Sequence, residues 1–220
     1  MKHLPDCRLY AFVDTAYLGN RAAAEIAGQL CDGGADLIQL RAKNSAPAEI
    51  LSLALELRRV TARSGVGLVV NDHLSVAREC QADFCHLGQE DFFDAGHTDA
   101  AELREGNPNV RIGLSTHAPE QAARAVKAGA DYVAVGPVYA TGTKPTARPV
   151  TLDYVRWAAA NISVPWFAIG GINLRNLDDV LAAGATRICV VSAILNAENV
   201  AAACREFRQR LDETGRAPLA

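Results

Sequence analysis

Short apolar runs alternate with amphipathic segments rich in Ala and Leu along the whole chain. Four of the apolar runs follow a turn of small residues that usually ends in Asp, at 33–36, 80–83, 128–131 and 183–186. Such a turn is typical of a helix that ends on a small or Gly residue and leads directly into a buried strand. The turns lie about 50 residues apart, which is too long for one strand and helix but fits two. The repeat therefore predicts eight strand–helix units, the number that closes into a barrel.

The other four predicted strands lie between these turns and lack strict alternation, as expected for strands buried on both faces. They cover 9–14, 67–72, 111–117 and 166–171, and helices are predicted at 21–30, 48–63, 119–128, 152–160, 174–182 and 197–211. An open doubly wound sheet is the alternative, but the repeat is even from end to end and no G-x-G-x-x-G follows the first strand. We predict an α/β fold, a single (β/α)8 TIM barrel over residues 1–220 with a frayed tail after about residue 211.

Composition and charge exclude several classes of protein. An apolar fraction of 50% is sufficient for a sizeable core, and the net charge of −3 comes without a basic patch for nucleic acid or an anionic membrane. No apolar run is long enough to span a membrane, and Pro5, Asp6 and Arg8 interrupt the N-terminus where a signal peptide needs an apolar run. The six cysteines form no C-x-x-C pair, so we expect reduced thiols in a cytoplasmic protein. The oligomeric state stays open, a homo-oligomer included.

Charged residues cluster where the predicted strands end, and such barrels build their active sites at the C-terminal ends of the strands. Arg41, Lys43 and Lys144 are cations that indicate a polyanionic ligand. Asp72 and Asp91 would oppose a simple anion, but they suit a Mg²⁺ ion held between carboxylates and a diphosphate. The alternative is a pair of salt bridges at the rim, Arg41–Asp72 and Lys43–Asp91.

A second group of residues predicts a phosphate site after the last two strands. Gly170-Gly171 and Val191-Ser192 offer small residues and backbone N–H groups where this fold commonly binds phosphate. The loop Thr141-Gly142-Thr143-Lys144 has the composition of a phosphate-contacting lid, although an ordinary turn is the alternative. A diphosphate–metal site and a monophosphate site over one barrel predict a transferase acting on two small phosphorylated substrates.

Seven sequence blocks together resemble the thiamine phosphate synthase family. They occur in the family's order over nearly the whole chain: QLRAK (39–43), VVNDH (69–73), HLGQED (86–91), GLSTH (113–117), GPVYATGTKP (136–145), AIGGI (168–172) and VVSAI (190–194). The resemblance implies a barrel enzyme that joins 4-amino-2-methyl-5-hydroxymethylpyrimidine diphosphate to 4-methyl-5-hydroxyethylthiazole phosphate, or to its carboxylated tautomer. The implied products are thiamine phosphate and pyrophosphate, and the implied cofactor is Mg²⁺.

The resemblance also implies roles for individual residues. The pyrimidine-diphosphate contacts fall on Gln39, Arg41, Lys43, Asn71, Ser115 and Lys144. The thiazole-phosphate contacts fall on Thr141, Gly142, Thr143, Gly171, Val191 and Ser192, and the Mg²⁺ ligands fall on Asp72 and Asp91.

The reaction implied by the resemblance is dissociative: pyrophosphate leaves first, and the thiazole nitrogen then captures a pyrimidine methyl cation. Such a reaction needs no strong base but does need a preorganised positive cradle for the leaving group. Arg41, Lys144 and Ser115 are therefore the expected catalytic residues. We interpret His117 as a supporting donor or a rim residue rather than a direct participant.

The chain departs from the family pattern after the lid, where it reads PTARPVTLDYV and lacks an acidic residue near Thr146, which puts the closure of the lid in question. Three other functions remain open: a thiazole tautomerase-like relative, another phosphate-binding barrel isomerase, and a silent barrel that binds thiazole phosphate or thiamine phosphate without turnover. A tautomerase typically lacks the second carboxylate or the lid, and both are present here. An isomerase needs an acid–base pair, for which Asp14 and His117 are the candidates.

Overall fold

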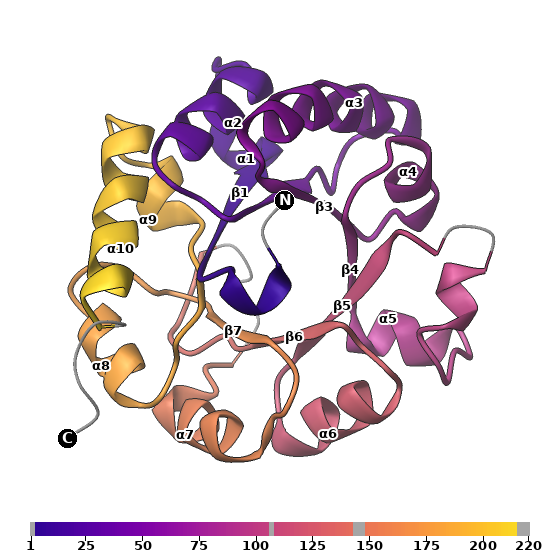
Figure 1. Ribbon diagram of the computed structural model, residues 1–220, viewed down its shortest axis with the longest axis vertical. Coiled ribbons are helices and arrows are strands. Elements are labelled where there is room, and N and C mark those ends of the chain that lie inside the picture. The colour runs from indigo at the N-terminus through magenta and orange to yellow at the C-terminus, as the bar shows by residue number, and fades with distance from the viewer. Residues whose placement is uncertain (1–2, 106–107, 143–147, 215–220) are drawn as a thin grey trace.

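The computed structural model describes residues 3–105, 108–142 and 148–214. Within these residues, eight parallel strands pair in chain order and the last pairs with the first, which closes a barrel (Figure 1). The strands are β1 (Leu9–Asp14), β2 (Leu37–Arg41), β3 (Gly67–Asn71), β4 (Phe84–Gly88), β5 (Arg111–Thr116), β6 (Tyr132–Val135), β7 (Trp166–Ile169) and β8 (Ile188–Cys189). The predicted (β/α)8 barrel is confirmed, and the alternative of an open sheet is wrong.

Helices surround the barrel in chain order (Figure 1). They are α1 (Thr15–Leu18), α2 (Ala23–Asp32), α3 (Pro47–Ser64), α4 (Leu74–Glu79), α5 (Gln89–Asp94), α6 (Pro119–Lys127), α7 (Thr151–Asn161), α8 (Leu177–Ala182), α9 (Ser192–Leu195) and α10 (Val200–Thr214), with the 3-10 helices η1 (Leu4–Asp6) and η2 (Glu102–Arg104). In the described part of the chain, no helix has both the length and the apolar character needed to cross a membrane.

Local sequence explains why these helices begin and end where they do. α3 begins with Pro47, whose missing N–H costs nothing in the first turn, and ends before Gly65, which adopts a left-handed φ of 67°. Its buried residues Ile50, Ala54 and Leu57 recur at intervals of three and four, so one face of the helix packs on the barrel.

Several helices and strands begin or end up to three residues away from the predicted bounds, and three local features bear on the site or on the C-terminal tail. β8 contains only Ile188 and Cys189, because the chain bends at Val191 and enters α9 at Ser192. α5 begins directly after β4, so Asp91 lies in the first turn of a helix. α10 continues past Leu211 to Thr214, because Leu211 is fully buried against the barrel.

The Asp residues of the repeated turn fasten the N-terminal ends of strands. In each case one carboxylate oxygen accepts a hydrogen bond from a backbone N–H at the start of the preceding strand and another from an arginine on the outside of the barrel. The pairs of donors are Leu9 (3.0 Å) and Arg208 (2.7 Å) for Asp36, Leu68 (2.9 Å) and Arg58 (3.0 Å) for Asp83, and Ile112 (2.7 Å) and Arg104 (2.6 Å) for Asp131. The repeat therefore stabilises the N-terminal end of the barrel, which in this fold contributes to stability rather than to catalysis.

The same end of the barrel is covered by η1, which lies across its mouth in Figure 1. Behind it, the rings of Tyr10, Phe84, Tyr132 and Phe167 fill the interior with edge-to-face contacts, with centroids 5.4–6.0 Å apart. The filled interior leaves the opposite, C-terminal end of the barrel for a binding site.

Candidate active site

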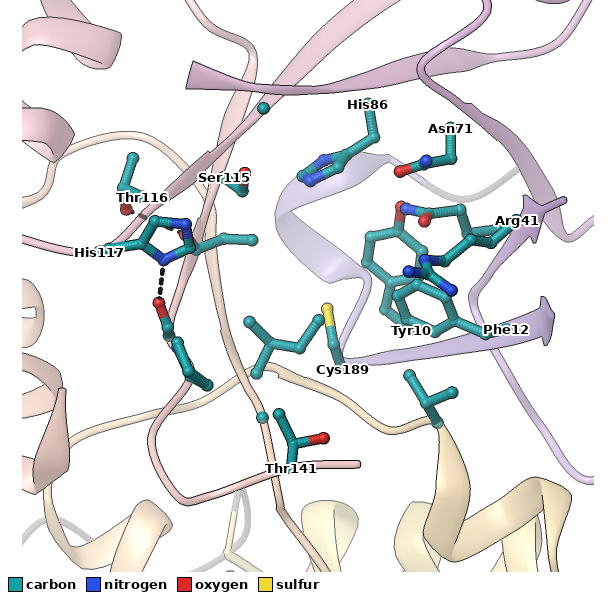
Figure 2. Close-up of a pocket in the computed structure, with 18 of the residues that line it drawn as sticks. Tyr10, Phe12, Arg41, Asn71, His86, Ser115, Thr116, His117, Thr141 and Cys189 are labelled. Carbon is teal, nitrogen blue, oxygen red and sulfur yellow. Dashed lines mark hydrogen bonds between the residues drawn. The ribbon is translucent and has the colours of Figure 1, made fainter. Parts of the chain in front are cut away.

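A pocket opens at the C-terminal ends of the strands, and all eight strands contribute to its lining (Figure 2). The strand residues that line it are Tyr10 and Phe12 (β1), Gln39 and Arg41 (β2), Asn71 (β3), His86 and Gly88 (β4), Ser115 and Thr116 (β5), Ala134 (β6), Ile169 (β7) and Cys189 (β8). The pocket encloses about 1020 Å³, part of it open to solvent.

Most of the residues predicted from the sequence line this one pocket. They are Gln39, Arg41, Lys43, Asn71, Asp72, Asp91, Ser115, Thr141, Gly171, Val191 and Ser192. Gly142 is exposed in the loop that follows Thr141. Thr143 and Lys144, and with them the lid segment 143–147, lie outside the described residues.

Arg41 is held by Asp14, its neighbour across the β1–β2 ladder. The Nη1 atom of Arg41 lies 2.6 Å from Oδ2 of Asp14, a carboxylate that is only 1% exposed. Oδ1 of Asp14 accepts a second hydrogen bond from the backbone N–H of Ala16, at 3.0 Å. A carboxylate fixed at both oxygens orients the guanidinium and leaves the rest of its fork for an anion. The alternative salt bridge Arg41–Asp72 is therefore wrong.

Asp72 is held at the end of β3 in an unusual backbone conformation. Its φ is 64°, and its backbone N–H donates to the His86 carbonyl at 2.8 Å. Its Oδ2 accepts from Asn71 Nδ2 at 2.6 Å and lies 3.7 Å from Lys43 Nζ. Lys43 thus pairs with Asp72 instead of with Asp91, the partner named in the salt-bridge alternative.

Asp91 reaches the pocket from the first turn of α5. Its carboxylate lies against the Cα of Gly88, and a Cβ atom at Gly88 would come within 2.5 Å of Asp91 Oδ2. Glycine at the end of β4 therefore leaves the space that this carboxylate occupies.

Asp72 and Asp91 fit Mg²⁺ better than a metal that needs a complete protein cage. Among the described residues, no group of three or more His, Cys, Asp or Glu side chains is placed to hold a metal ion. Structural zinc sites use four protein ligands, whereas Mg²⁺ commonly takes one or two carboxylates and completes its shell with water and phosphate oxygens. The donor set fits Mg²⁺ bound together with a diphosphate.

The floor of the pocket is a chain of buried hydrogen bonds that sequence reasoning missed. Gln39 Nε2 donates to the Tyr10 hydroxyl (2.6 Å), which lies 3.0 Å from the Tyr132 hydroxyl, which in turn lies 3.0 Å from His86 Nδ1. Both hydroxyl protons find an acceptor in this chain only if Tyr10 donates to Tyr132 and Tyr132 donates to His86 Nδ1. His86 then carries its proton on Nε2. Burial raises the pKa of Tyr10 and Tyr132 well above the ordinary value, so both stay neutral donors.

A sequence signal for part of this floor did exist. Side chains along a strand alternate between its two faces, so Tyr10 faces the same side as Asp14, and His86 the same side as Gly88. Both stand in apolar runs that read as core, which concealed their polar atoms. The same rule places Tyr132 on the face of Ala134, but it does not reveal that the ring reaches the floor through space left by Gly113, where a Cβ would lie 2.1 Å from Tyr132 Cζ.

The opposite wall of the pocket is built where the loop after β6 lies along the end of β7. Val138 N–H donates to the Ile169 carbonyl at 2.8 Å, and Tyr139 N–H donates to the Gly170 carbonyl at 3.0 Å. Gly171 has a φ of 66°, and a Cβ there would lie 2.6 Å from the Ala140 carbonyl oxygen. Glycine is therefore required at this position both by conformation and by close approach.

The first turn of α9 completes this wall. Val191 precedes the helix and Ser192 begins it, where backbone N–H groups have no partners within the helix. The other end of α9 is held by Arg21, whose Nη2 donates to the Leu195 carbonyl at 2.9 Å. A four-residue helix anchored in this way presents N–H donors at the position where this fold commonly binds phosphate.

Three consecutive residues at the end of β5 point in different directions. Ser115 and Thr116 both line the pocket, but Thr116 is fully buried and its hydroxyl contacts the Ala134 carbonyl (2.9 Å) and the Tyr154 hydroxyl (2.7 Å). His117 lines the pocket with one edge, and its Nδ1 contacts the Gly136 carbonyl (Figure 2).

Comparison with known proteins identifies relatives over nearly the whole chain. A family model described as thiamine monophosphate synthase matches residues 9–194. Thiamine-phosphate synthase of Lawsonia intracellularis is 39% identical over 94% of this chain and 93% of its own, and that of Halalkalibacterium halodurans is 40% identical over 96% and 98%. The solved thiamine phosphate pyrophosphorylase from Pyrococcus furiosus superposes with a TM-score of 0.83 at 32% identity and covers 94% of this chain and 96% of its own. These findings agree with the resemblance that the seven sequence blocks indicated.

Proposed function

This chain belongs to the thiamine monophosphate synthase family and is a transferase of thiamine biosynthesis, and from that premise we propose how its pocket performs the reaction. It joins 4-amino-2-methyl-5-hydroxymethylpyrimidine diphosphate to 4-methyl-5-hydroxyethylthiazole phosphate and releases thiamine phosphate and pyrophosphate. The observation that carries the proposal is that one pocket has two sides of different chemistry, which we interpret as two anion-binding sites. Arg41, Lys43 and the two aspartates line one side, and Gly171 with the first turn of α9 lines the other.

The side formed by β2 to β4 binds the diphosphate. Arg41, oriented by Asp14, offers its remaining N–H groups to phosphate oxygens, and Lys43 adds a point charge that shifts from Asp72 when the ligand binds. Asp72 and Asp91 would hold Mg²⁺. When bound, that ion neutralises charge on the diphosphate and so makes pyrophosphate a better leaving group. Lys144, which lies outside the described residues, is our candidate for a further cation that binds the same group.

The floor of the pocket positions the pyrimidine. Gln39 commits its amide nitrogen to Tyr10, which leaves its carbonyl oxygen as an acceptor, and His86 offers a protonated Nε2 as a donor. A flat heterocycle with an exocyclic amino group and a ring nitrogen matches this arrangement of acceptor and donor. The Tyr10 and Phe12 rings, stacked 5.2 Å apart, supply an apolar surface beside it.

The other side binds the thiazole phosphate. Backbone N–H groups at Gly171, Val191 and Ser192 receive the phosphate, and Thr141 adds a hydroxyl group. Gly142 and Thr143 are our candidates for further phosphate contacts. The thiazole nitrogen then faces the pyrimidine methylene carbon. In the reaction the bond between that carbon and the diphosphate oxygen breaks, and a bond from the thiazole nitrogen to the same carbon forms.

No group in this sequence of steps has to remove a proton, so the work of the protein is orientation and stabilisation of charge. Ser115 lines the same pocket, and its hydroxyl group donates a hydrogen bond to the departing pyrophosphate. We place the reaction in the cytoplasm, with small phosphorylated molecules as its partners.

Turnover by purified protein with Mg²⁺ and both substrates tests this proposal, with thiamine phosphate detected by chromatography. Asp91→Ala is expected to abolish Mg²⁺-dependent turnover and to leave binding of thiazole phosphate within about twofold, because Asp91 lies on the diphosphate side. Asp94→Ala is the matched control, since it removes an exposed carboxylate from the same helix.

Three results would contradict the proposal. Absence of product while both ligands bind would favour the silent barrel. Equal loss of thiazole-phosphate affinity in Asp91→Ala would show that the division of the pocket into two sides is wrong. Conversion between thiazole tautomers without pyrimidine transfer would identify the tautomerase alternative.

A further inference from the structure

His117 has one nitrogen committed to the backbone of the neighbouring strand. Its Nδ1 lies 2.5 Å from the carbonyl oxygen of Gly136, the residue after β6 (Figure 2). A carbonyl oxygen only accepts, so Nδ1 carries the proton. The backbone N–H of His117 is fixed as well, because it donates to Gln121 Oε1 at 2.7 Å.

Gly136 is the start of the loop that forms the thiazole-phosphate side of the pocket. A Cβ at Gly136 would lie 2.1 Å from the Ile169 carbonyl oxygen, so the backbone of β7 packs closely against one side of this residue. The loop then follows β7 through the backbone bonds of Val138 and Tyr139 and arrives at Thr141 in the pocket. β7 limits the position of the loop on one flank, and His117 restrains it on the other.

His117 and the diphosphate side lie across the pocket from each other. Figure 2 shows Arg41 and Asn71 on one side, with His117 and Thr141 on the other. The ring of His117 therefore acts on the wall that carries Thr141 and, through Tyr139 and Ala140, on Gly171.

We propose that His117 is a positioning residue: its Nδ1–H holds the Gly136 carbonyl and thereby sets the loop that presents Thr141 and Gly171 to the thiazole phosphate. This assignment rests on the proposed function for the identity of the ligand. The proposal depends on which ring nitrogen is used, because Nδ1 contacts the loop and Nε2 takes no part in that hydrogen bond.

Two isosteric substitutions separate the nitrogens. In His117→Asn the side-chain amide nitrogen takes the place of Nδ1, and in His117→Gln it takes the place of Nε2. We expect His117→Asn to keep most of the wild-type turnover. We expect His117→Gln to raise the KM and the Kd for 4-methyl-5-hydroxyethylthiazole phosphate about three- to tenfold, the effect of one lost hydrogen bond, while the KM for the pyrimidine diphosphate changes less than about twofold.

The opposite order, with Gln better than Asn, would overturn the proposal in favour of a direct role for Nε2. Equal activity of both variants with wild type would also overturn it, because the bond to Gly136 would then be dispensable. His97→Asn and His97→Gln are the matched controls: they make the same two changes at a histidine outside the pocket, whose Nδ1 contacts Glu102 Oε2 at 2.9 Å, and they are expected to leave both KM values unchanged.

A measurement on the wild-type protein needs no variant. ¹⁵N NMR of the His117 ring is expected to show a protonated Nδ1 and an unprotonated Nε2 at pH 8, and the reverse tautomer would refute the assignment. Calorimetry with thiazole phosphate alone measures the effect of His117→Gln without turnover. A wild-type protein that binds this ligand but makes no product therefore contradicts the proposed function and leaves the comparison of Asn and Gln intact.

Discussion

Replacing Asp36 with alanine would remove the most buried of the three repeated carboxylates. Its side chain is fully buried, and its Oδ2 accepts from Arg8 N–H (2.7 Å), Leu9 N–H (3.0 Å) and Arg208 Nη1 (2.7 Å). Alanine offers no acceptor to any of these donors. Leu9 is itself fully buried, so its N–H cannot turn to water without opening the start of β1.

The expected cost follows from what is left unpaired. A buried donor without a partner costs about 1–3 kcal/mol, and breaking a buried ion pair on one side costs about 3–5 kcal/mol. Arg208 is 21% exposed and recovers part of its hydration, so we expect Asp36→Ala to lower the free energy of unfolding by about 3–5 kcal/mol in total. Asp83 has two donors and is 18% exposed, so we expect about 1.5–3 kcal/mol for Asp83→Ala.

Urea unfolding followed by circular dichroism measures both values on the same m-value scale. Because these carboxylates lie at the end of the barrel opposite to the pocket, turnover by the folded variants is expected to equal that of wild type. Asp36→Asn is the matched variant, since it keeps one acceptor and should fall between wild type and Asp36→Ala. A cost below about 1 kcal/mol for Asp36→Ala, or one no larger than that of Asp83→Ala, would refute the reasoning.

Two further predictions concern the interior. Gly113→Ala is expected to lower the free energy of unfolding by about 3 kcal/mol, because its Cβ would lie 2.1 Å from the fully buried Tyr132 ring. Gly28→Ala, at an open position in a helix, is the control and should raise the free energy of unfolding by about 0.5–1 kcal/mol. A melting temperature of Gly113→Ala equal to that of wild type would contradict the account of the floor. Burial raises the pKa of the Cys85 and Cys204 thiols from 9.0 to about 12, so above pH 9 the unfolded chain loses protons that the native chain keeps. The free energy of unfolding should therefore fall as pH rises from about 9 towards 12, by up to about 1.4 kcal/mol per pH unit for each thiol. Urea unfolding at pH 8 and 10 checks this, and an equal decline in a variant with alanine at both positions would rule it out.

Local patterns in the sequence were sufficient for the architecture. The repeated turn predicted eight strands, because helix ends and buried strands have composition signals that act over a few residues. The same signals placed Arg41, Asp72, Ser115 and Ser192 near strand ends, and parallel strands bring their ends to one face of the barrel. The lining of a single pocket by these residues follows directly from that arrangement.

Other features depended on contacts between strands that are distant in the chain. The partner of Arg41 is Asp14 and not Asp72, because the register of β1 against β2 places the two opposite each other. The floor joins Tyr10, Gln39 and His86 through Tyr132, and a pattern of apolar residues does not reveal which hydroxyl groups meet across the barrel. Such contacts depend on the stagger of the strands, which no local signal encodes.

The Asp of the repeated turn illustrates the same division. The sequence by itself determined where each turn lies and that a strand follows it, since a tight turn and an apolar run are recognisable locally. Only the tertiary structure decided what the carboxylates do, because each of Asp36, Asp83 and Asp131 bonds to the strand that precedes it in the barrel and to an arginine from a different element. A side chain's neighbours in the chain are specified by covalent bonds, whereas its partners across the fold exist only once the barrel has closed.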